Sequence, residues 1–166
     1  PGILTPDRSA IMFAPKLQLR DSDLSKLYRS IPYPSYVEND ATSSGHAEWF
    51  SRGARGNMAY VSLESGIGGS VLIGGSPYHG TNQRSCEFGH MCVVPGGLPC
   101  SCGKHGCLEQ YSSATGVVRC MKKLLDENPD TPCTLRGTEF AAKDVFDAAR
   151  NGDALAAREV DEMTDT

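Results

Sequence analysis

Apolar and polar residues alternate along the first half of the chain in the manner of short strands. The alternation from Met58 to Leu63 predicts one strand, and the apolar stretch from Gly69 to Ile73 predicts a second. The glycine pair Gly74-Gly75 then predicts a turn into the extended piece Ser76-Pro77-Tyr78. Two further extended pieces are expected at residues 17–19 and 36–39.

Helical spacing dominates the second half of the chain. It predicts helices at about 108–127, 141–149 and 153–163, the first two linked by the Asn128 to Pro132 stretch. The third helix carries Glu159, which is expected at the surface. Two shorter helices are predicted upstream, at 22–30 before Ile31-Pro32 and at about 41–55, and Trp49-Phe50 in the latter is expected in the core or at an interface.

Composition and charge narrow the class of protein. The 166 residues, 39% of them hydrophobic, can form one globular domain, or two small ones that share a core. The longest apolar stretches, such as Val71 to Ile73 and Met91 to Val94, are far shorter than the ~18 residues expected of a membrane helix. The net charge is −4, and no cluster of Lys or Arg extends beyond Lys122-Lys123. These residues are therefore expected to bind neither membranes nor, by themselves, nucleic acid.

Both ends of the sequence indicate part of a longer protein. The chain starts at Pro1, and the helical pattern of residues 154–166 reaches the last residue without a Gly or Pro beyond it. A DNA-binding module, if the protein has one, would precede Pro1.

Glycines and cysteines gather in the middle of the chain. Eleven of the 18 glycines fall between Gly66 and Gly106, which predicts loops with close backbone approach, where binding sites are built. The seven cysteines are an odd number at uneven spacing, which is unlike a secreted disulfide framework. They favour a metal site in a reducing compartment, and thus a cytoplasmic protein.

Three of these thiols lie within one eight-residue segment, 100–107, which we call the knuckle. Gly103 and Gly106 lie between Cys102 and Cys107, so the segment that carries Cys100, Cys102 and Cys107 can curl around one cation. Zinc takes four nitrogen or sulfur ligands in a tetrahedron. Candidates for the fourth ligand are His90, His105, Cys92 and Cys86. His90 is the better choice because the ring of His105, inside the tight loop, would point outward. Free buried thiols or a redox pair are the alternatives to zinc.

Four motifs together resemble the ROK family of bacterial sugar kinases and sugar-responsive transcriptional repressors. They are Tyr36-Val37-Glu38-Asn39-Asp40, Ser65-Gly66-Ile67-Gly68-Gly69, Glu87-Phe88-Gly89-His90-Met91 and the knuckle continued to Leu108-Glu109. The resemblance implies an α/β chain that is the central fragment of an actin-like (ribonuclease H-like) sugar-kinase fold, with a zinc-binding loop and a C-terminal helical segment. It implies a sugar-binding region at 1–113 and a helical segment of the same domain at 114–166. The family's N-terminal phosphate loop, Asp-x-Gly-Gly-Thr, and its C-terminal nucleotide segment are absent from the sequence.

The resemblance also implies roles for individual residues. Carboxylates and amides suit the vicinal hydroxyls of a sugar. The expected sugar contacts are Asn39, Asp40, Glu87, His90 and Glu109. In the family's kinases the residue matching Asp40 is the general base. Those matching His90, Cys100, Cys102 and Cys107 hold a structural zinc ion.

Simpler interpretations stay open for several of these residues. Asn39-Asp40 before a helix is also an ordinary N-cap. Glu87 and Glu109, taken singly, are more often solvated surface charges.

One difference from the family's kinase motif bears on whether the chain resembles the kinases or the repressors. Its kinases carry Leu-Gly-Thr-Gly-Ile-Gly, whereas this chain has a degenerate phosphate loop in which Ser65, Gly66 and Gly68 follow Glu64. A carboxylate at Glu64 would repel the phosphates of ATP. The expectation is therefore the sugar-sensing domain of a repressor, with an ATP- and Mg²⁺-dependent sugar kinase of the glucokinase type as the alternative. A homodimer is expected through the helical segment. A zinc-stapled interaction domain without sugar binding is a third possibility.

Overall fold

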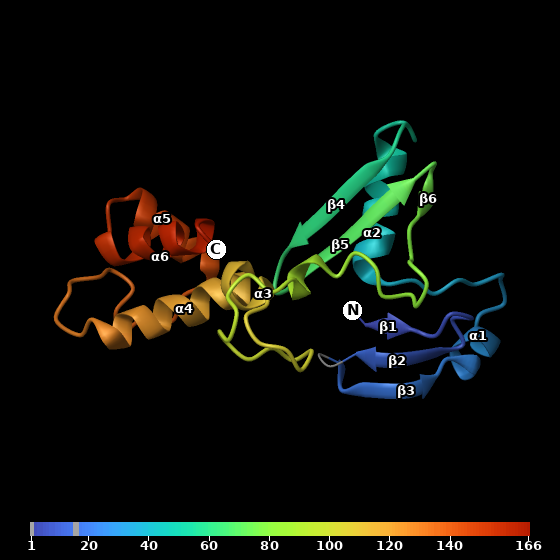
Figure 1. The fold of residues 1–166 in the computed structure, drawn as a ribbon, viewed down its shortest axis with the longest axis horizontal. Helices are drawn as coiled ribbons and strands as arrows, with labels where there is room; N and C mark the ends of the chain where they lie inside the picture. The colour runs from blue at the N-terminus through green and yellow to red at the C-terminus, as the bar shows by residue number, and fades with distance from the viewer. Residues whose placement is uncertain (1, 15–16) are drawn as a thin grey trace. The chain divides into compact units, whose positions relative to one another are not determined.

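A computed structural model describes residues 2–14 and 17–166 of the chain. They divide into two compact units (Figure 1). The first unit comprises Pro1–Val61 and Gly68–Glu87, and the second comprises Ser62–Ile67 and Phe88–Thr166. In the described part of the chain, no helix combines the length and the apolar character needed to cross a membrane.

The first unit begins with a small antiparallel sheet. Strands β1 (Ile3–Leu4), β2 (Ala10–Ala14) and β3 (Leu19–Asp23) pair in the order β1-β2-β3, and helix α1 (Ser25–Ser30) follows. The inner positions Leu4, Ala14 and Leu24 are buried. The helix ends just before Ile31-Pro32, as predicted. Of the extended piece expected at 17–19, only Leu19 is in a strand, and residues 15–16 before it lie outside the described residues.

Helix α2 and a second sheet complete this unit. The strands are β4 (Met58–Leu63), β5 (Ile67–Ile73) and β6 (Ser76–Pro77), in the order β4-β5-β6, so the predicted strands and turn are confirmed. Helix α2 (Asp40–Ser51) lies along the sheet (Figure 1). The two elements approach closely because small residues face each other. A methyl group on Gly45 would lie 2.8 Å from the Ser70 Cβ atom.

The same close approach makes Gly68 a sensitive position. The Gly68→Ala variant should lower the free energy of unfolding by about 1–3 kcal/mol, as overpacking usually does. The new methyl would lie 2.7 Å from Cβ of Ala41, and neither atom can move without its backbone. Urea unfolding of the purified protein measures the loss. Adding Ala41→Gly removes the clashing methyl and should recover part of it, whereas unchanged stability of Gly68→Ala would refute the contact.

The second unit is mainly helical. It contains the 3₁₀ turn η2 (Phe88–His90) and helices α3 (Glu109–Ser112), α4 (Ala114–Glu127), α5 (Ala142–Arg150) and α6 (Ala154–Thr164). Helices α4, α5 and α6 pack together around one apolar core (Figure 1). Its fully buried members include Val117, Met121 and Val145. The predicted helix 108–127 is interrupted at Ser113, which has an extended backbone and caps α4 by accepting a hydrogen bond from the Gly116 N–H.

Three expectations from the sequence are wrong. Residues 36–39 form no strand, because they find no pairing partner and lead directly into the cap of α2. For Phe50 only the core alternative is wrong, because its position on α2 leaves it 73% exposed, and the interface alternative stays a prediction. Glu159 is not at the surface but only 3% exposed, because it faces inward on α6 next to the buried residues Leu155 and Ala156.

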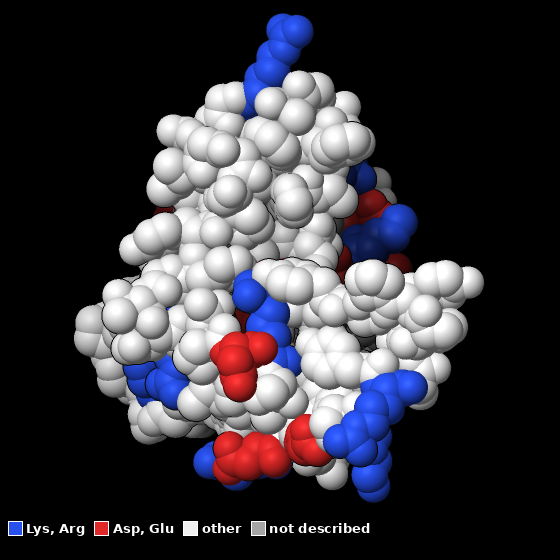
Figure 2. All heavy atoms as spheres, turned by 90° about the vertical axis from the view of Figure 1, so that its right-hand side faces the viewer, with Lys and Arg blue, Asp and Glu red and all other residues white. Residues whose placement is uncertain are grey.

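Charged side chains are dispersed over the face that Figure 2 shows. Lys and Arg groups lie there in several separate places, often beside Asp or Glu, and large areas are uncharged. This distribution matches the modest net charge of −4.

Candidate functional site

The knuckle is a tight loop held by its own backbone. Short antiparallel bridges join Cys92 to Cys107 and Pro99 to His105. The Cys100 N–H donates to the Lys104 carbonyl at 2.8 Å. Gly106 has φ of 74°, and a side chain there would collide with the Val94 carbonyl, so only glycine fits. Glycine at this position therefore lets the loop fold back and bring its cysteines together.

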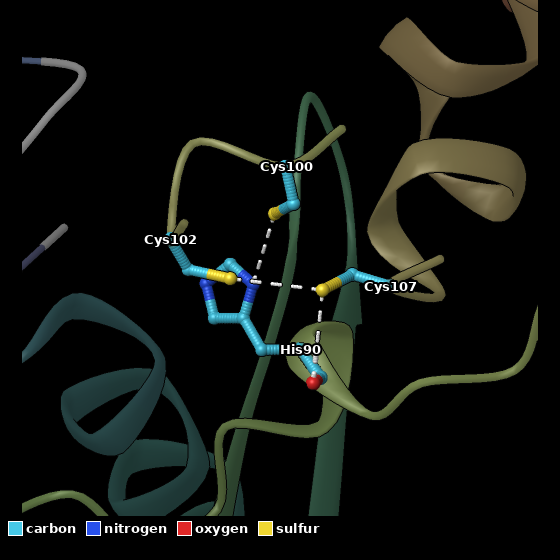
Figure 3. Close-up of side chains that lie close together, drawn as sticks. All are labelled: His90, Cys100, Cys102 and Cys107. Atoms are coloured by element: carbon cyan, nitrogen blue, oxygen red, sulfur yellow. Dashed lines mark hydrogen bonds between the residues drawn. The ribbon is translucent and has the colours of Figure 1, made fainter. Parts of the chain in front are cut away.

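Four side chains converge at this loop (Figure 3). The ligand atoms of His90, Cys100, Cys102 and Cys107 all lie within 4.8 Å of one another. The Cys100 sulfur is 3.5 Å from His90 Nδ1, and the sulfurs of Cys102 and Cys107 are 3.6 Å apart. In a tetrahedral zinc site, bond lengths of ~2.3 Å to sulfur and ~2.0 Å to nitrogen separate the ligand atoms by about 3.5–3.8 Å. The four residues chosen from the sequence thus have the spacing of a metal site.

Two thiols of this cluster have shifted pKa values because they lie close to other thiols in a partly buried loop. Burial, together with the neighbouring thiols Cys102 and Cys100, raises the pKa of Cys107 to about 12. Burial also acts to raise the pKa of Cys102, but hydrogen bonds from Lys104 and the other two thiols outweigh it, so the net pKa is lowered. Thiolates crowded in this way repel one another, and a divalent cation removes the repulsion by binding them all.

Residues around the cluster orient it, and the sequence reasoning missed them. The buried Gln110 donates from Nε2 to the Cys100 sulfur at 3.4 Å. Lys104 donates from Nζ to the His90 carbonyl at 2.8 Å. Arg119 in turn donates to the Gln110 carbonyl. Such outer contacts fix the direction of metal ligands. The position of Gln110, three residues after Cys107, was the available signal.

Asn39 and Asp40 lie at the start of α2 in the first unit. The Asn39 side chain accepts a hydrogen bond from the Thr42 N–H at 3.2 Å and donates to the Gly2 carbonyl at 3.1 Å. The capping role left open by the sequence is therefore confirmed. Asp40 is exposed and accepts from the Ala41 N–H at 3.0 Å. A cap still leaves acceptor and donor capacity on Asn39, so its predicted contact with sugar stays a prediction.

The remaining predicted sugar contacts occupy both units. Glu87 is exposed and ends the first unit, directly before η2. Glu109 begins α3 in the second unit, where its Oε2 atom accepts from the Ile67 N–H at 2.9 Å. Glu109 is therefore no solvated surface charge, because it joins α3 to the first residue of β5. His90 belongs to the second unit through the metal cluster.

The predicted phosphate loop is the turn between β4 and β5. Glu64 is exposed there, and its carboxylate accepts a hydrogen bond from the Ser62 hydroxyl at 3.1 Å. The turn is anchored to the start of α4, because the Ala114 N–H donates to the Glu64 carbonyl and the Thr115 hydroxyl donates to the Ser65 carbonyl. The Glu64 carboxylate thus lies on a turn whose backbone is fixed by hydrogen bonds from α4.

Comparison with known protein families decides the wider assignment. The sequence profile described as ROK family matches residues 1–166 of this chain. This chain belongs to the ROK family. The resemblance inferred from its motifs is thereby confirmed.

The curated ROK relatives include both kinases and repressors. The chain is 36% identical over 170 residues to a glucokinase of Halalkalibacterium halodurans. This alignment covers 98% of the chain and 52% of that protein. The chain is 34% identical over 125 residues to the xylose repressor of Bacillus subtilis, covering 74% of the chain and 32% of that protein. The chain thus spans about half the length of the glucokinase, and the matched part covers about a third of the repressor.

Solved ROK structures confirm the mixed α/β, actin-like class of fold. A Streptomyces griseus ROK glucokinase, in complex with glucose and AMPPNP, matches with a TM-score of 0.78 and 32% identity over 98% of this chain and 55% of that one. A ROK family transcriptional regulator, a homologue of the E. coli MLC protein, matches with a TM-score of 0.81 and 24% identity, over 98% of this chain and 42% of that one. The second likeness concerns the fold alone.

Proposed function

We propose that this ROK chain binds a sugar and is part of the ligand-sensing region of a transcriptional repressor. The sugar contacts in this proposal are Asn39, Asp40, Glu87, His90 and Glu109. Two placements support it. Within the first unit, the Asp40 end of α2 packs against Gly68 through Ala41, and within the second unit Glu109 accepts a hydrogen bond from the backbone N–H of Ile67. Recognition of DNA belongs to a module outside these residues, and a homodimer would form through the helical second unit.

Glu64 is the observation that favours a sensor over a kinase. Kinases of this family have glycine where this chain has Glu64, and glycine lets bare backbone amides face the phosphates of ATP. Here an exposed carboxylate occupies the turn and is held by Ser62 at 3.1 Å. Two negative charges a few ångströms apart repel each other by several kcal/mol where water is partly excluded.

A sugar kinase is the second candidate, and the glucokinase relatives favour it. Asp40 is exposed at the start of α2, where a general base has access to a sugar hydroxyl. The kinase would also need ATP and Mg²⁺. Its phosphate contacts on this chain would come from Ser65, Gly66 and Gly68.

Turnover by the whole protein distinguishes the two candidates. With ATP, Mg²⁺ and a panel of hexoses, we expect sugar binding but no phosphorylation above background. The double variant Glu64→Gly, Ser65→Thr restores the kinase-like turn and should strengthen nucleotide binding. Phosphorylation by the unmodified protein at the ~1–100 s⁻¹ usual for kinases would overturn the sensor proposal.

We further propose that His90, Cys100, Cys102 and Cys107 hold one structural zinc ion. Their spacing and chemistry fit this metal. Four protein ligands leave no open position for a reacting water, so zinc here would hold the loop that presents His90 and Glu109.

The sugar contacts can be tested at Glu87. The Glu87→Ala variant should weaken hexose binding by the whole protein roughly ten- to a hundredfold, because a hydrogen bond to a charged group contributes about 1.5–3 kcal/mol. Calorimetry measures the affinity. Glu139→Ala is the control, because the Glu139 side chain is 97% exposed on the second unit. Equal affinities of the two variants would remove Glu87 from the site, and no binding of any sugar by the unmodified protein would favour a zinc-stapled interaction domain.

A further inference from the structure

An ionic cluster lies directly before the predicted sugar contacts of α2. Arg8 Nη2 donates to Glu38 Oε2 at 2.8 Å, and both side chains are largely buried, with 17% and 13% exposed. The other carboxylate oxygen, Glu38 Oε1, accepts from the backbone N–H of Asn39 at 2.9 Å. Glu38 therefore connects the hairpin that carries Arg8 to the peptide group at the start of α2.

His79 completes the fixation of Arg8. Its Nε2 atom lies 3.0 Å from Arg8 Nη2. A guanidinium group can only donate, so His79 Nε2 accepts this hydrogen bond, and the same atom lies 3.5 Å from Glu38 Oε2. The two hydrogens of Arg8 Nη2 thus serve Glu38 and His79. Arg8 also lies over the Tyr36 ring, with its guanidinium carbon 4.5 Å from the ring centre.

The backbone of Arg8 adopts a strained conformation where its side chain contacts Glu38 and His79. Its φ is 57°, in the left-handed region that favours glycine. The Arg8 N–H donates to the Thr5 carbonyl at 2.8 Å, and the Arg8 carbonyl accepts from the Tyr28 hydroxyl at 3.0 Å. Arg8 Nε is buried and has no hydrogen-bond partner among the described residues. Strain and an unsatisfied donor persist where surrounding contacts over-determine a conformation, often next to a functional site.

We propose that Arg8 and Glu38 are positioning residues for sugar recognition: they hold the peptide before α2 so that Asn39 and Asp40 face the sugar in the correct geometry. The inference rests on the proposed sugar site at these two residues. Asn39 is held from several sides, since Glu38 binds its N–H while Gly2 and Thr42 bind its side chain. Loss of Glu38 would release the N–H and leave only the side-chain contacts.

Binding and stability should respond differently to this cluster. Replacing a buried ion pair by apolar residues of similar size is often neutral for stability or even favourable. Hydrogen bonding to a ligand, in contrast, depends on placement within about 0.5 Å. An apolar replacement of both partners should therefore preserve folding and still weaken sugar binding.

The test compares two paired variants of the whole protein by calorimetry with glucose and with xylose. In Arg8→Met, Glu38→Met, we expect an unfolding midpoint close to that of the unmodified protein and an affinity at least tenfold lower for whichever sugar binds. The matched control is Arg52→Met, Glu48→Met, an exposed ion pair near the other end of α2, which should stay within twofold. Unchanged affinity in the first pair, with folding retained, would overturn the proposal.

Single variants keep the test decisive if that double variant does not fold. Glu38→Gln retains the size of the side chain but cannot accept from both Arg8 and Asn39 with its two terminal atoms, so affinity should fall about tenfold. Arg8→Lys retains a cation for Glu38 and should restore most of the affinity that Arg8→Met loses. Affinity within twofold in Glu38→Gln, or no difference between the Lys and Met variants, would refute the role. Asp40→Asn separates the two proposals: if it also leaves affinity unchanged, the sugar site itself is wrong.

Discussion

Replacing Cys107 with serine is expected to remove the metal and to lower the unfolding midpoint of the protein by about 6–12 °C. A serine hydroxyl is a poor zinc ligand at neutral pH, and three ligands hold the ion weakly. In the proposed site the metal would close a loop that has little apolar core of its own. We expect its loss to reduce stability by roughly 3 kcal/mol, a part of the ~10–16 kcal/mol that zinc provides in isolated zinc-finger peptides. For a chain of this size, 1 kcal/mol shifts the midpoint by about 2–4 °C.

Elemental analysis of the purified protein should find one zinc ion per chain, and less in Cys102→Ser and Cys107→Ser. Cys92→Ser is the matched control, because Cys92 is exposed and lies close in sequence to His90 but outside the four-residue cluster. It should retain full zinc and an unchanged midpoint. Full zinc occupancy in the double variant Cys102→Ser, Cys107→Ser would eliminate the assignment.

The sequence predicted those parts of the fold that depend on local patterns. Strand β4 alternates strictly between half-buried and exposed positions, which is the period-2 signal that was found at Met58–Leu63. Helix α6 begins at a recognisable cap, Asp153, whose side chain accepts from the Ala156 N–H at 3.1 Å. The knuckle was predictable for the same reason, because its three cysteines lie within eight residues.

The strands that the sequence did not predict depend on partners distant in the sequence. Strand β2, Ala10–Ala14, is a short run without alternation, and β3, Leu19–Asp23, is mostly polar, so neither carries a clear strand pattern alone. Conversely, Tyr36 and Val37 have strand-forming side chains, but the segment 36–39 has no strand to pair with among the described residues. Pairing energy comes from the neighbour, and a single segment does not contain it.

The contacts at the start of α2 were not predicted for the same reason. Arg8 is 30 residues from Glu38 and 71 from His79 in sequence. Nothing in the local pattern joins these positions, although Glu38 stands next to Asn39. The burial of Glu159 was also hidden, because a glutamate in an amphipathic helix normally belongs to the solvated face.

Glu159 is an ionisable group inside the helical unit. Burial, and secondarily the charge of Glu162, raises the pKa of Glu159 from 4.5 to about 7. Among the described residues its carboxyl group has no hydrogen-bond partner or ion pair. On the neighbouring helix α4, burial and the charge of Glu159 likewise raise the pKa of the Cys120 thiol. The protonated form of Glu159 is therefore the one that suits the fold.

This arrangement predicts that Glu159→Gln will stabilise the protein at pH 8 but not at low pH. Because the folded pKa lies above the unfolded one, the stabilisation from Glu159 is complete below about pH 4.5 and is lost as pH rises through about 7. A shift of this size corresponds to at most about 3 kcal/mol, which solvent screening reduces to about 1–2 kcal/mol. Glutamine stays neutral at every pH, so the variant should lack this loss. Urea unfolding of the variant and the unmodified protein at pH 4.5 and pH 8 measures the difference, and any zinc release at low pH affects both alike. Glu139→Gln, a change at an exposed site, should show the same dependence of stability on pH as the unmodified protein. The burial argument fails if Glu159→Gln shows that same dependence.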